Sequence, residues 1–223
     1  MTGPCSAGPR RTCVSFSSRS GEPNLLQPGA AGELPAGFSW LNEPPHWTLD
    51  GKGLSITPDA PTDFFRPYRG DPRDNCCLLY RLVKGDFTAV AHALAHLVDF
   101  GDAAALTVRS GPQQWAKLCL ERSPVGDVSL VSVVTDPWSD DANSELLATP
   151  ESLLRITRKG NVFGMHYSSD GSRWRFVRTF GLEMPDEVMV GIHAQAPFSS
   201  GCRVTFRSFS ISPKPVGDFR SGE

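Results

Sequence analysis

The sequence predicts an all-β domain, and three observations carry that prediction. The dominant period of the apolar residues is two, as expected for strands that bury one face. The 223 residues include 21 Gly and 19 Pro, and such frequent turn residues suit many short strands better than a helical bundle. Turn sequences such as Lys159-Gly160-Asn161 and Asp170-Gly171 separate the alternating segments at the spacing typical of a β-sandwich or barrel.

The alternating segments give the expected strands in chain order. Residues 128–135 are compact and β-branched, as in a strand that is buried on both faces. The other segments alternate apolar and polar residues. The full series is 54–57, 87–98, 116–121, 128–135, 154–158, 162–167, 174–180, 188–195 and 202–211. We also expect Trp174 to face the core together with Phe176 and Phe180.

Residues 87–98, FTAVAHALAHLV, have the composition of a helix and the alternation of a strand. We predict a strand, because the sheet context usually overrides local propensity. His92 and His96 have the histidine spacing of H-E-x-x-H, but Ala93 stands where that motif has Glu. On a strand the two rings would be about 13 Å apart, which is too far for one metal. We expect no metal ion and no cofactor.

Composition divides the chain into one domain with two loose ends. Residues 1–37 hold six Gly, five Pro and five Ser, too little apolar surface to offset the entropy of ordering. We therefore expect a disordered leader over 1–37, a β-sandwich over 38–211 and a flexible tail over 212–223.

Charge and cysteine usage limit the partners and the compartment. The formal net charge is −2, so a basic footprint for nucleic acid or a polybasic membrane patch is absent. The six cysteines include no C-x-x-C spacing, which removes the zinc-ribbon and thioredoxin patterns. Free buried thiols in a reducing, cytoplasmic compartment are the expectation.

A run of short matches resembles one family. The chain shows, in order, F-S-W-L-N-E-P-P at 38–45, T-D-F-F at 62–65, K-L-C-L-E at 117–121, S-V-V-T at 132–135, H-Y-S-S-D-G at 166–171 with Trp174, and G-I-H-A-Q-A-P at 191–197. These stretches are similar to the regulation-of-enolase protein family. The resemblance implies a concanavalin A-like jelly-roll of two antiparallel sheets, one of them concave, as in the lectin/glucanase superfamily. It implies no established reaction.

Sorting each strand by face suggests a ligand site. Alternation places Trp115, Lys117 and Glu121 on one side of their strand, with Ala116, Leu118 and Leu120 on the other. If the strands share a sheet, polar and aromatic groups gather on its outer face, where they suit a sugar or another polar ligand. The candidate ligand-binding residues are Trp115, Lys117, Glu121, Arg155, His166 and His193. An ordinary solvated face with an ion pair between Glu121 and Lys117 is the other interpretation.

The sequence favours binding over catalysis. Glycoside hydrolysis needs two carboxylates at a set distance, and Glu121 is the only acid on its strand. We therefore expect no catalytic residue and a non-catalytic β-sandwich binding protein, whose ligand is a carbohydrate-like molecule or a partner protein. The family name implies a link to carbohydrate metabolism. The alternative is a sugar-active enzyme that uses Glu121 with a histidine as acid and base.

Overall fold

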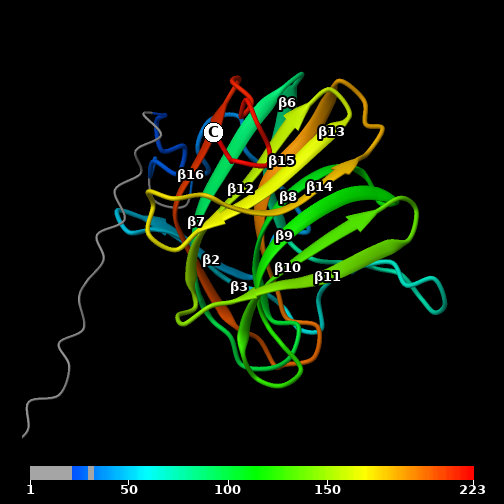
Figure 1. Ribbon diagram of the computed structural model, residues 1–223. Helices are drawn as coiled ribbons and strands as arrows, with labels where there is room; N and C mark the ends of the chain where they lie inside the picture. Colours follow the sequence, from blue (N-terminus) through cyan, green and yellow to red (C-terminus); the bar gives the residue numbers. More distant parts are fainter. Residues whose placement is uncertain (1–21, 30–32) are drawn as a thin grey trace, which may run out of the picture.

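The computed structural model describes residues 22–29 and 33–223, and every named element in it is a strand. Two seven-stranded sheets pack face to face (Figure 1), and all strand pairs are antiparallel. The all-β, two-sheet prediction is therefore confirmed. None of the described residues forms a helix long and apolar enough to cross a membrane.

Sheet A contains most of the middle of the chain. Its strands, in spatial order, are β1 (Ser39–Leu41), β6 (Leu78–Lys84), β15 (Glu187–Gln195), β8 (Ala103–Gly111), β9 (Gln114–Arg122), β10 (Val128–Thr135) and β11 (Ser139–Leu146). The strands β8 to β11 follow one another as hairpins, and β15 inserts between β6 and β8.

Sheet B holds the remaining long strands, because the chain passes between the two sheets several times. Its spatial order is β14 (Arg175–Gly181), β13 (Val162–Ser168), β12 (Glu151–Lys159), β7 (Phe87–His96), β16 (Arg203–Ser212), β3 (Gly53–Thr57) and β2 (His46–Asp50). A short hairpin of β4 (Phe64–Phe65) and β5 (Arg73–Asp74) stands apart from both sheets. The Ala-rich segment is thus strand β7, as predicted.

The main core lies between the sheets and follows the predicted faces. Ala116, Leu118 and Leu120 of β9 are fully buried there. So are the inward residues of the other central strands, which are Ala89, Ala91 and Ala93 of β7, Leu154 and Ile156 of β12, Phe163 and Met165 of β13, and Val190, Ile192 and Ala194 of β15. The small alanines of β7 leave room for the large rings of Phe206 and Phe209, which lie in the same core.

Both expected loose ends pack against the domain where they are described. Leu26 is only 2 % exposed and belongs to the main core. The Leu25 N–H donates to the carbonyl of Phe209 at 2.7 Å, and the Phe209 N–H donates to Asn24 Oδ1 at 3.0 Å. The expectation of a leader without packing is therefore wrong for residues 22–29, and residues 1–21 lie outside the described part of the chain.

The C-terminal tail is also ordered, contrary to the expectation for 212–223. The red segment at that end lies against β12 and β13 in Figure 1. Its backbone accepts hydrogen bonds from Arg155 and His166 of those strands. The tail therefore forms a strap across the outer face of sheet B.

Trp174 does not occupy the core position expected for it. It is half-buried, and the Arg155 guanidinium lies 4.1 Å from its ring centroid on the outer face of sheet B. The pairing of β13 with β14 shifts register between Met165 and His166, because a bulge inserts one residue. Phe180 stacks on Phe163 on the core side, whereas Phe176 packs against His166 on the outer side.

Candidate functional site

The outer face of sheet A carries the first three predicted site residues. Alternation along β9 places Trp115, Lys117, Cys119 and Glu121 on the side away from sheet B, since Ala116, Leu118 and Leu120 are in the core between the sheets. A second, smaller apolar cluster covers this outer face and includes Trp115 and Cys119. The face is therefore only partly open to solvent.

The β4–β5 hairpin covers one end of that face. The Phe64 ring lies 6.2 Å from the Trp115 ring and 5.3 Å from the His193 ring, measured between centroids. Arg109 of β8 holds the hairpin by donating to both carboxylate oxygens of Asp74, at 2.8 and 2.9 Å. Because of this cover, Trp115 has no exposed surface, and its predicted role as a stacking platform for a ligand is wrong.

His193 is also removed from any ligand. It has no exposed surface, and its Nδ1 lies 2.9 Å from Thr107 Oγ1 while its Nε2 lies 3.3 Å from Gln195 Oε1. Burial, together with the positive charge of Lys117, lowers the pKa of His193 to about 3. His193 is therefore a neutral, internal residue that supports Gln195, and it does not contact the cavity.

Lys117 is the centre of a buried polar cluster. Its ammonium donates to Gln195 Oε1 at 2.7 Å, to the Phe64 carbonyl at 2.8 Å and to Asp63 Oδ1 at 3.1 Å. Burial alone would lower the pKa of Lys117, but the Asp63 carboxylate raises it above its usual value. Three acceptors match the three protons of the ammonium, so Lys117 is a structural cation that fixes the loop carrying Asp63.

A cavity of about 240 Å³ opens at the other end of β9, beyond the hairpin. Its polar lining comes from Lys117, Glu121, Asp63, Asp141 and Gln195. Its apolar lining comes from Phe65, Phe100, Val131, Val133, Pro197 and Phe198. Phe100 and Phe198 stack with centroids 5.3 Å apart and are both exposed, at 39 % and 57 %. The cavity thus combines hydrogen-bonding groups with accessible aromatic rings.

Glu121 is a half-buried acid that faces this cavity. Among the described residues, none donates a hydrogen bond to its carboxylate, and the expected ion pair with Lys117 is not formed. Burial raises the pKa of Glu121 to about 7, and the nearby Lys117 charge only partly opposes this effect. Near neutral pH the side chain therefore exists as both the acid and the carboxylate, so it can donate or accept a hydrogen bond.

Arg155 and His166 do not join this site. They are cross-strand partners on β12 and β13 of sheet B, whereas Lys117 and Glu121 belong to sheet A. The prediction of a single groove that contains His166 and Glu121 is therefore wrong. The predicted orientation is right, because both residues face away from the main core, but their face belongs to the other sheet.

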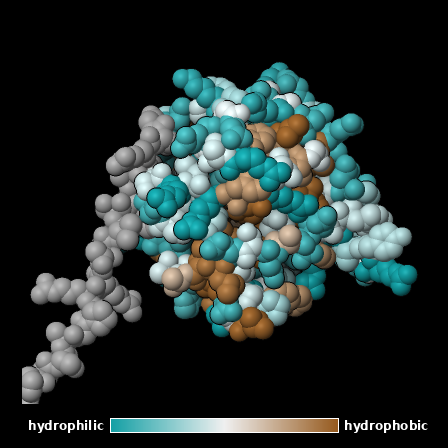
Figure 2. Space-filling model, viewed as in Figure 1, coloured by the Kyte–Doolittle hydropathy of each residue, from teal (hydrophilic) through white to brown (hydrophobic). Residues whose placement is uncertain are grey.

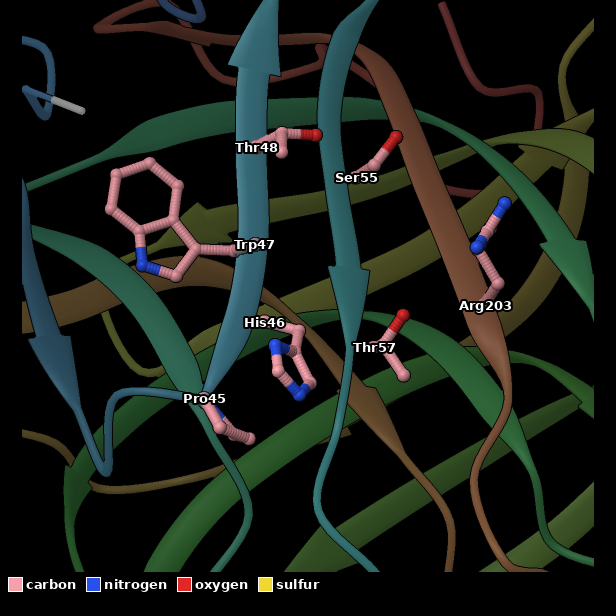
Figure 3. Close-up of a pocket in the computed structure, with 7 residues that line it drawn as sticks. All are labelled: Pro45, His46, Trp47, Thr48, Ser55, Thr57 and Arg203. Carbon is pink, nitrogen blue, oxygen red and sulfur yellow. The ribbon is translucent and has the colours of Figure 1, made fainter. Parts of the chain in front are cut away.

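The strands β2, β3 and β16 form a second cavity on sheet B, of about 460 Å³. Figure 3 shows the side chains that line it, which are His46, Trp47 and Thr48 of β2, Ser55 and Thr57 of β3, Arg203 of β16, and Pro45. Ser55 and Thr205 pair through their hydroxyl oxygens at 3.0 Å. The lining side chains are half-buried or exposed, so this groove has no desolvated polar group to orient a ligand.

Sequence reasoning missed most of the apolar lining of the sheet A cavity. Phe65, Phe100 and Phe198 come from the β4–β5 hairpin and from two turns, not from the central strands. A usable signal exists for two of them. Phe100 lies in Asp-Phe-Gly and Phe198 in Pro-Phe-Ser, and a large apolar residue among turn residues is often an exposed contact residue.

Comparison with known proteins places this two-sheet β-sandwich, with its cavity on the outer face of one sheet, in a family. The sequence model of the DUF1349 family, described as proteins of unknown function, matches residues 40–214. The chain belongs to that family.

A curated relative narrows the comparison further. The chain is 30 % identical over 181 residues to Regulation of enolase protein 1 of Saccharomyces cerevisiae, which covers 80 % of this chain and 90 % of that protein. A crystal structure described as a functionally unknown protein from Saccharomyces cerevisiae shares 28 % identity with a TM-score of 0.75, over 79 % of this chain and 96 % of that one.

Two more distant structures share the fold. One is the GH43 protein BlXynB from Bacillus licheniformis, with 14 % identity and a TM-score of 0.68, covering 86 % of this chain and 39 % of that chain. The other is the exoplasmic/lumenal domain of VIP36 in its Ca²⁺/Man3GlcNAc-bound form, with 12 % identity and a TM-score of 0.54, covering 82 % and 86 %. At these identities the likeness shows the lectin-like sandwich fold alone.

Proposed function

We propose that this protein is a non-catalytic binding protein, whose cavity on the outer face of sheet A takes a carbohydrate-like ligand. One observation carries the proposal, namely that Glu121 faces the cavity without a hydrogen-bond donor among the described residues. An unsatisfied polar group costs free energy when it is desolvated. A ligand hydroxyl would supply the missing partner.

The rest of the lining suits a polyol. Phe100 and Phe198, although stacked on each other, offer exposed aromatic surface at the cavity, which can cover the apolar face of a sugar ring. Asp141 on β11 adds a further carboxylate for ligand hydroxyls. A few directional polar groups among apolar and aromatic walls are the usual composition of a small-molecule site.

The comparisons support binding of this kind without testing it. The VIP36 domain that shares the fold is described as bound to Ca²⁺/Man3GlcNAc, and the yeast relative is named for regulation of enolase. We infer a regulatory role that depends on ligand binding, with a partner protein as the other candidate ligand. The free thiols of Cys76, Cys77, Cys119 and Cys202 support a cytoplasmic location.

The alternative of a sugar-active enzyme has one observation in its favour and two against it. The raised pKa of Glu121, about 7, is the property of a general acid. However, none of the five histidines of the chain lines this cavity, so the histidine that the alternative requires is missing. Asp63, one candidate for a second carboxylate, is already paired with Lys117 at 3.1 Å.

A thermal-shift screen tests the proposal. Mannotriose, xylotriose, maltotriose and glucose 6-phosphate are added to the full chain, because a ligand that binds only the native state raises the melting temperature. We expect at least one sugar to raise it in the wild type and less in Phe198→Ala. Val125→Ala is the matched control, since Val125 is 83 % exposed and outside the cavity lining. No shift with any sugar would contradict the proposal.

A further inference from the structure

The strap at the C-terminal end covers a polar strip on the outer face of sheet B. His166 Nε2 lies 2.7 Å from the Phe219 carbonyl oxygen, and the Arg155 Nη2 group donates to the Gly222 carbonyl at 2.8 Å. The Phe219 ring sits on Gly164, where an added Cβ would come within 2.8 Å of it. The missing side chain of Gly164 therefore makes the socket for Phe219.

Beneath the strap, Arg155 is a buried charge without a counter-charge. Arg155 is only 5 % exposed. Among the described residues no carboxylate forms an ion pair with it. Burial lowers its pKa to about 10, so the guanidinium remains positive at neutral pH. A buried cation that lacks a charged partner is costly.

Two nitrogen atoms at this place have no hydrogen-bond partner. They are Arg155 Nε, which is a donor, and His166 Nδ1, and both are buried. Burial lowers the pKa of His166 to about 4, and its Nε2–H donates to the Phe219 carbonyl, so Nδ1 of the neutral ring is an acceptor. The strap satisfies only one other nitrogen on each side chain, through neutral backbone carbonyls. The centroid of the Trp174 ring lies 4.1 Å from the guanidinium carbon, and this cation–π contact positions the Arg155 fork. The arrangement is thus a planar cation that is positioned but not neutralised.

We propose that the Arg155 guanidinium, together with the Nε2–H of His166, forms an oxyanion-binding site for a carboxylate or phosphate group. Residues 217–223 of the strap occupy both donors and block the site until the strap opens. A two-oxygen anion fits the fork of a guanidinium, because parallel N–H···O bonds form a bidentate pair. The site is independent of the sheet A cavity, since it lies on the other sheet. Its ligand competes with the strap for the same guanidinium.

The strap is suited to opening. Its backbone carbonyls accept hydrogen bonds from the sheet, including one from Lys159 to the Gly217 carbonyl at 3.2 Å. Two cation–π contacts add to these, between Lys159 and the Phe219 ring and between Arg220 and the Phe176 ring. Segments that bury few apolar groups open at a lower free energy than the core. Displacing the strap would therefore leave the sandwich intact.

The test follows the Arg155 side chain in the full chain by NMR. The arginine Nε–H resonance, assigned by its loss in Arg155→Gln, is followed during titrations with inorganic phosphate and, separately, with acetate at constant ionic strength. We expect a saturable shift. In Phe219→Ala, which removes the strap's anchor, the half-saturating concentration should fall about tenfold or more, since the competent state is more populated.

Two further variants keep the result interpretable. Gly164→Ala should tighten anion binding as Phe219→Ala does, because its Cβ blocks the socket. Arg203→Gln should change nothing, because Arg203 lines the separate groove of Figure 3. Saturation by phosphate alone identifies a phosphate site, and saturation by both anions identifies a general oxyanion site. If neither anion moves the resonance in the wild type or in the folded strap variants, the proposal is overturned.

Discussion

The Lys117 ammonium donates to Gln195 Oε1 at 2.7 Å and forms no ion pair with Glu121, although both side chains lie on the outer face of β9. Four residues of a strand separate them by about 13 Å. Lys117 therefore organises the covered end of the face, where it joins β15 to the β4–β5 hairpin. Glu121 remains available at the open end, which is the basis of the proposed ligand site.

The Lys117 cluster should be essential for stability. Lys117→Met leaves Asp63 and Gln195 without their shared donor, and loss of one partner of a buried ion pair costs about 3–5 kcal/mol. Urea unfolding measures this free energy. Lys52→Met, at an exposed position, is the control and should change little. A loss below about 1 kcal/mol for Lys117→Met would show that the cluster is not a structural centre.

The protonation of Glu121 should make stability fall as pH rises. The pKa of Glu121 in the folded state is about 7, above its ordinary value of 4.5. Between these values the folded state binds more protons at Glu121 than the unfolded state does, so the contribution of Glu121 to the free energy of unfolding decreases with pH. The buried neutral ring of His193, whose pKa is lowered to about 3, contributes with the opposite sign below its ordinary pKa of 6.5. Glu121→Gln should remove the Glu121 contribution to the pH dependence and stabilise the protein at pH 8 by about 1–2 kcal/mol, discounted for contact with water. Denaturation at pH 5 and pH 8 measures the difference, and an unchanged slope in Glu121→Gln would contradict the assignment.

Residues 22–29 should contribute to folding stability. Leu26 is 2 % exposed in the main core, so Leu26→Ala should cost about 2–4 kcal/mol. Gln27→Ala, next to it and exposed, should be nearly neutral. Thermal or urea unfolding of both variants decides the matter. Equal stability of the two would mean that this segment does not pack in solution.

Trp174 should matter less than a core aromatic. Because it lies on the outer face against Arg155, Trp174→Ala should cost about 1 kcal/mol. Phe163 is fully buried in the main core, so Phe163→Ala should lower the free energy of unfolding by about 3–5 kcal/mol. The comparison by urea unfolding tests the bulge in β14, since a regular register would place Trp174 inside and make the two losses alike.

Sequence periodicity predicted which way side chains point, but not which sheet carries them. Leu118 and Ile192 face the core as alternation requires, and His166 faces outward as expected. A period of two is a property of one strand, whereas the assignment of β12 and β13 to sheet B depends on long-range pairing. The predicted site was therefore divided between two faces.

The segments that cover the two outer faces could not be predicted from periodicity either. The β4–β5 hairpin buries Trp115, and the strap covers Arg155 and His166, yet neither segment has a periodic pattern. The signal of the strap is a single apolar residue in polar surroundings, Phe219, and that of the hairpin is the pair Phe64-Phe65. On the face shown in Figure 2, hydrophilic residues predominate and the hydrophobic residues lie in separate patches.

The central claim is that Glu121 binds a ligand in the sheet A cavity without catalysing its breakdown. The most direct measurement is a calorimetric titration of the sugar that gives the largest thermal shift, with product analysis of the same mixtures. We predict binding by the wild type, binding weakened a few-fold in Glu121→Gln and more strongly in Phe198→Ala, and an intact sugar throughout. Binding that is equal in all three proteins, or sugar cleavage that Glu121→Gln abolishes, would contradict the account.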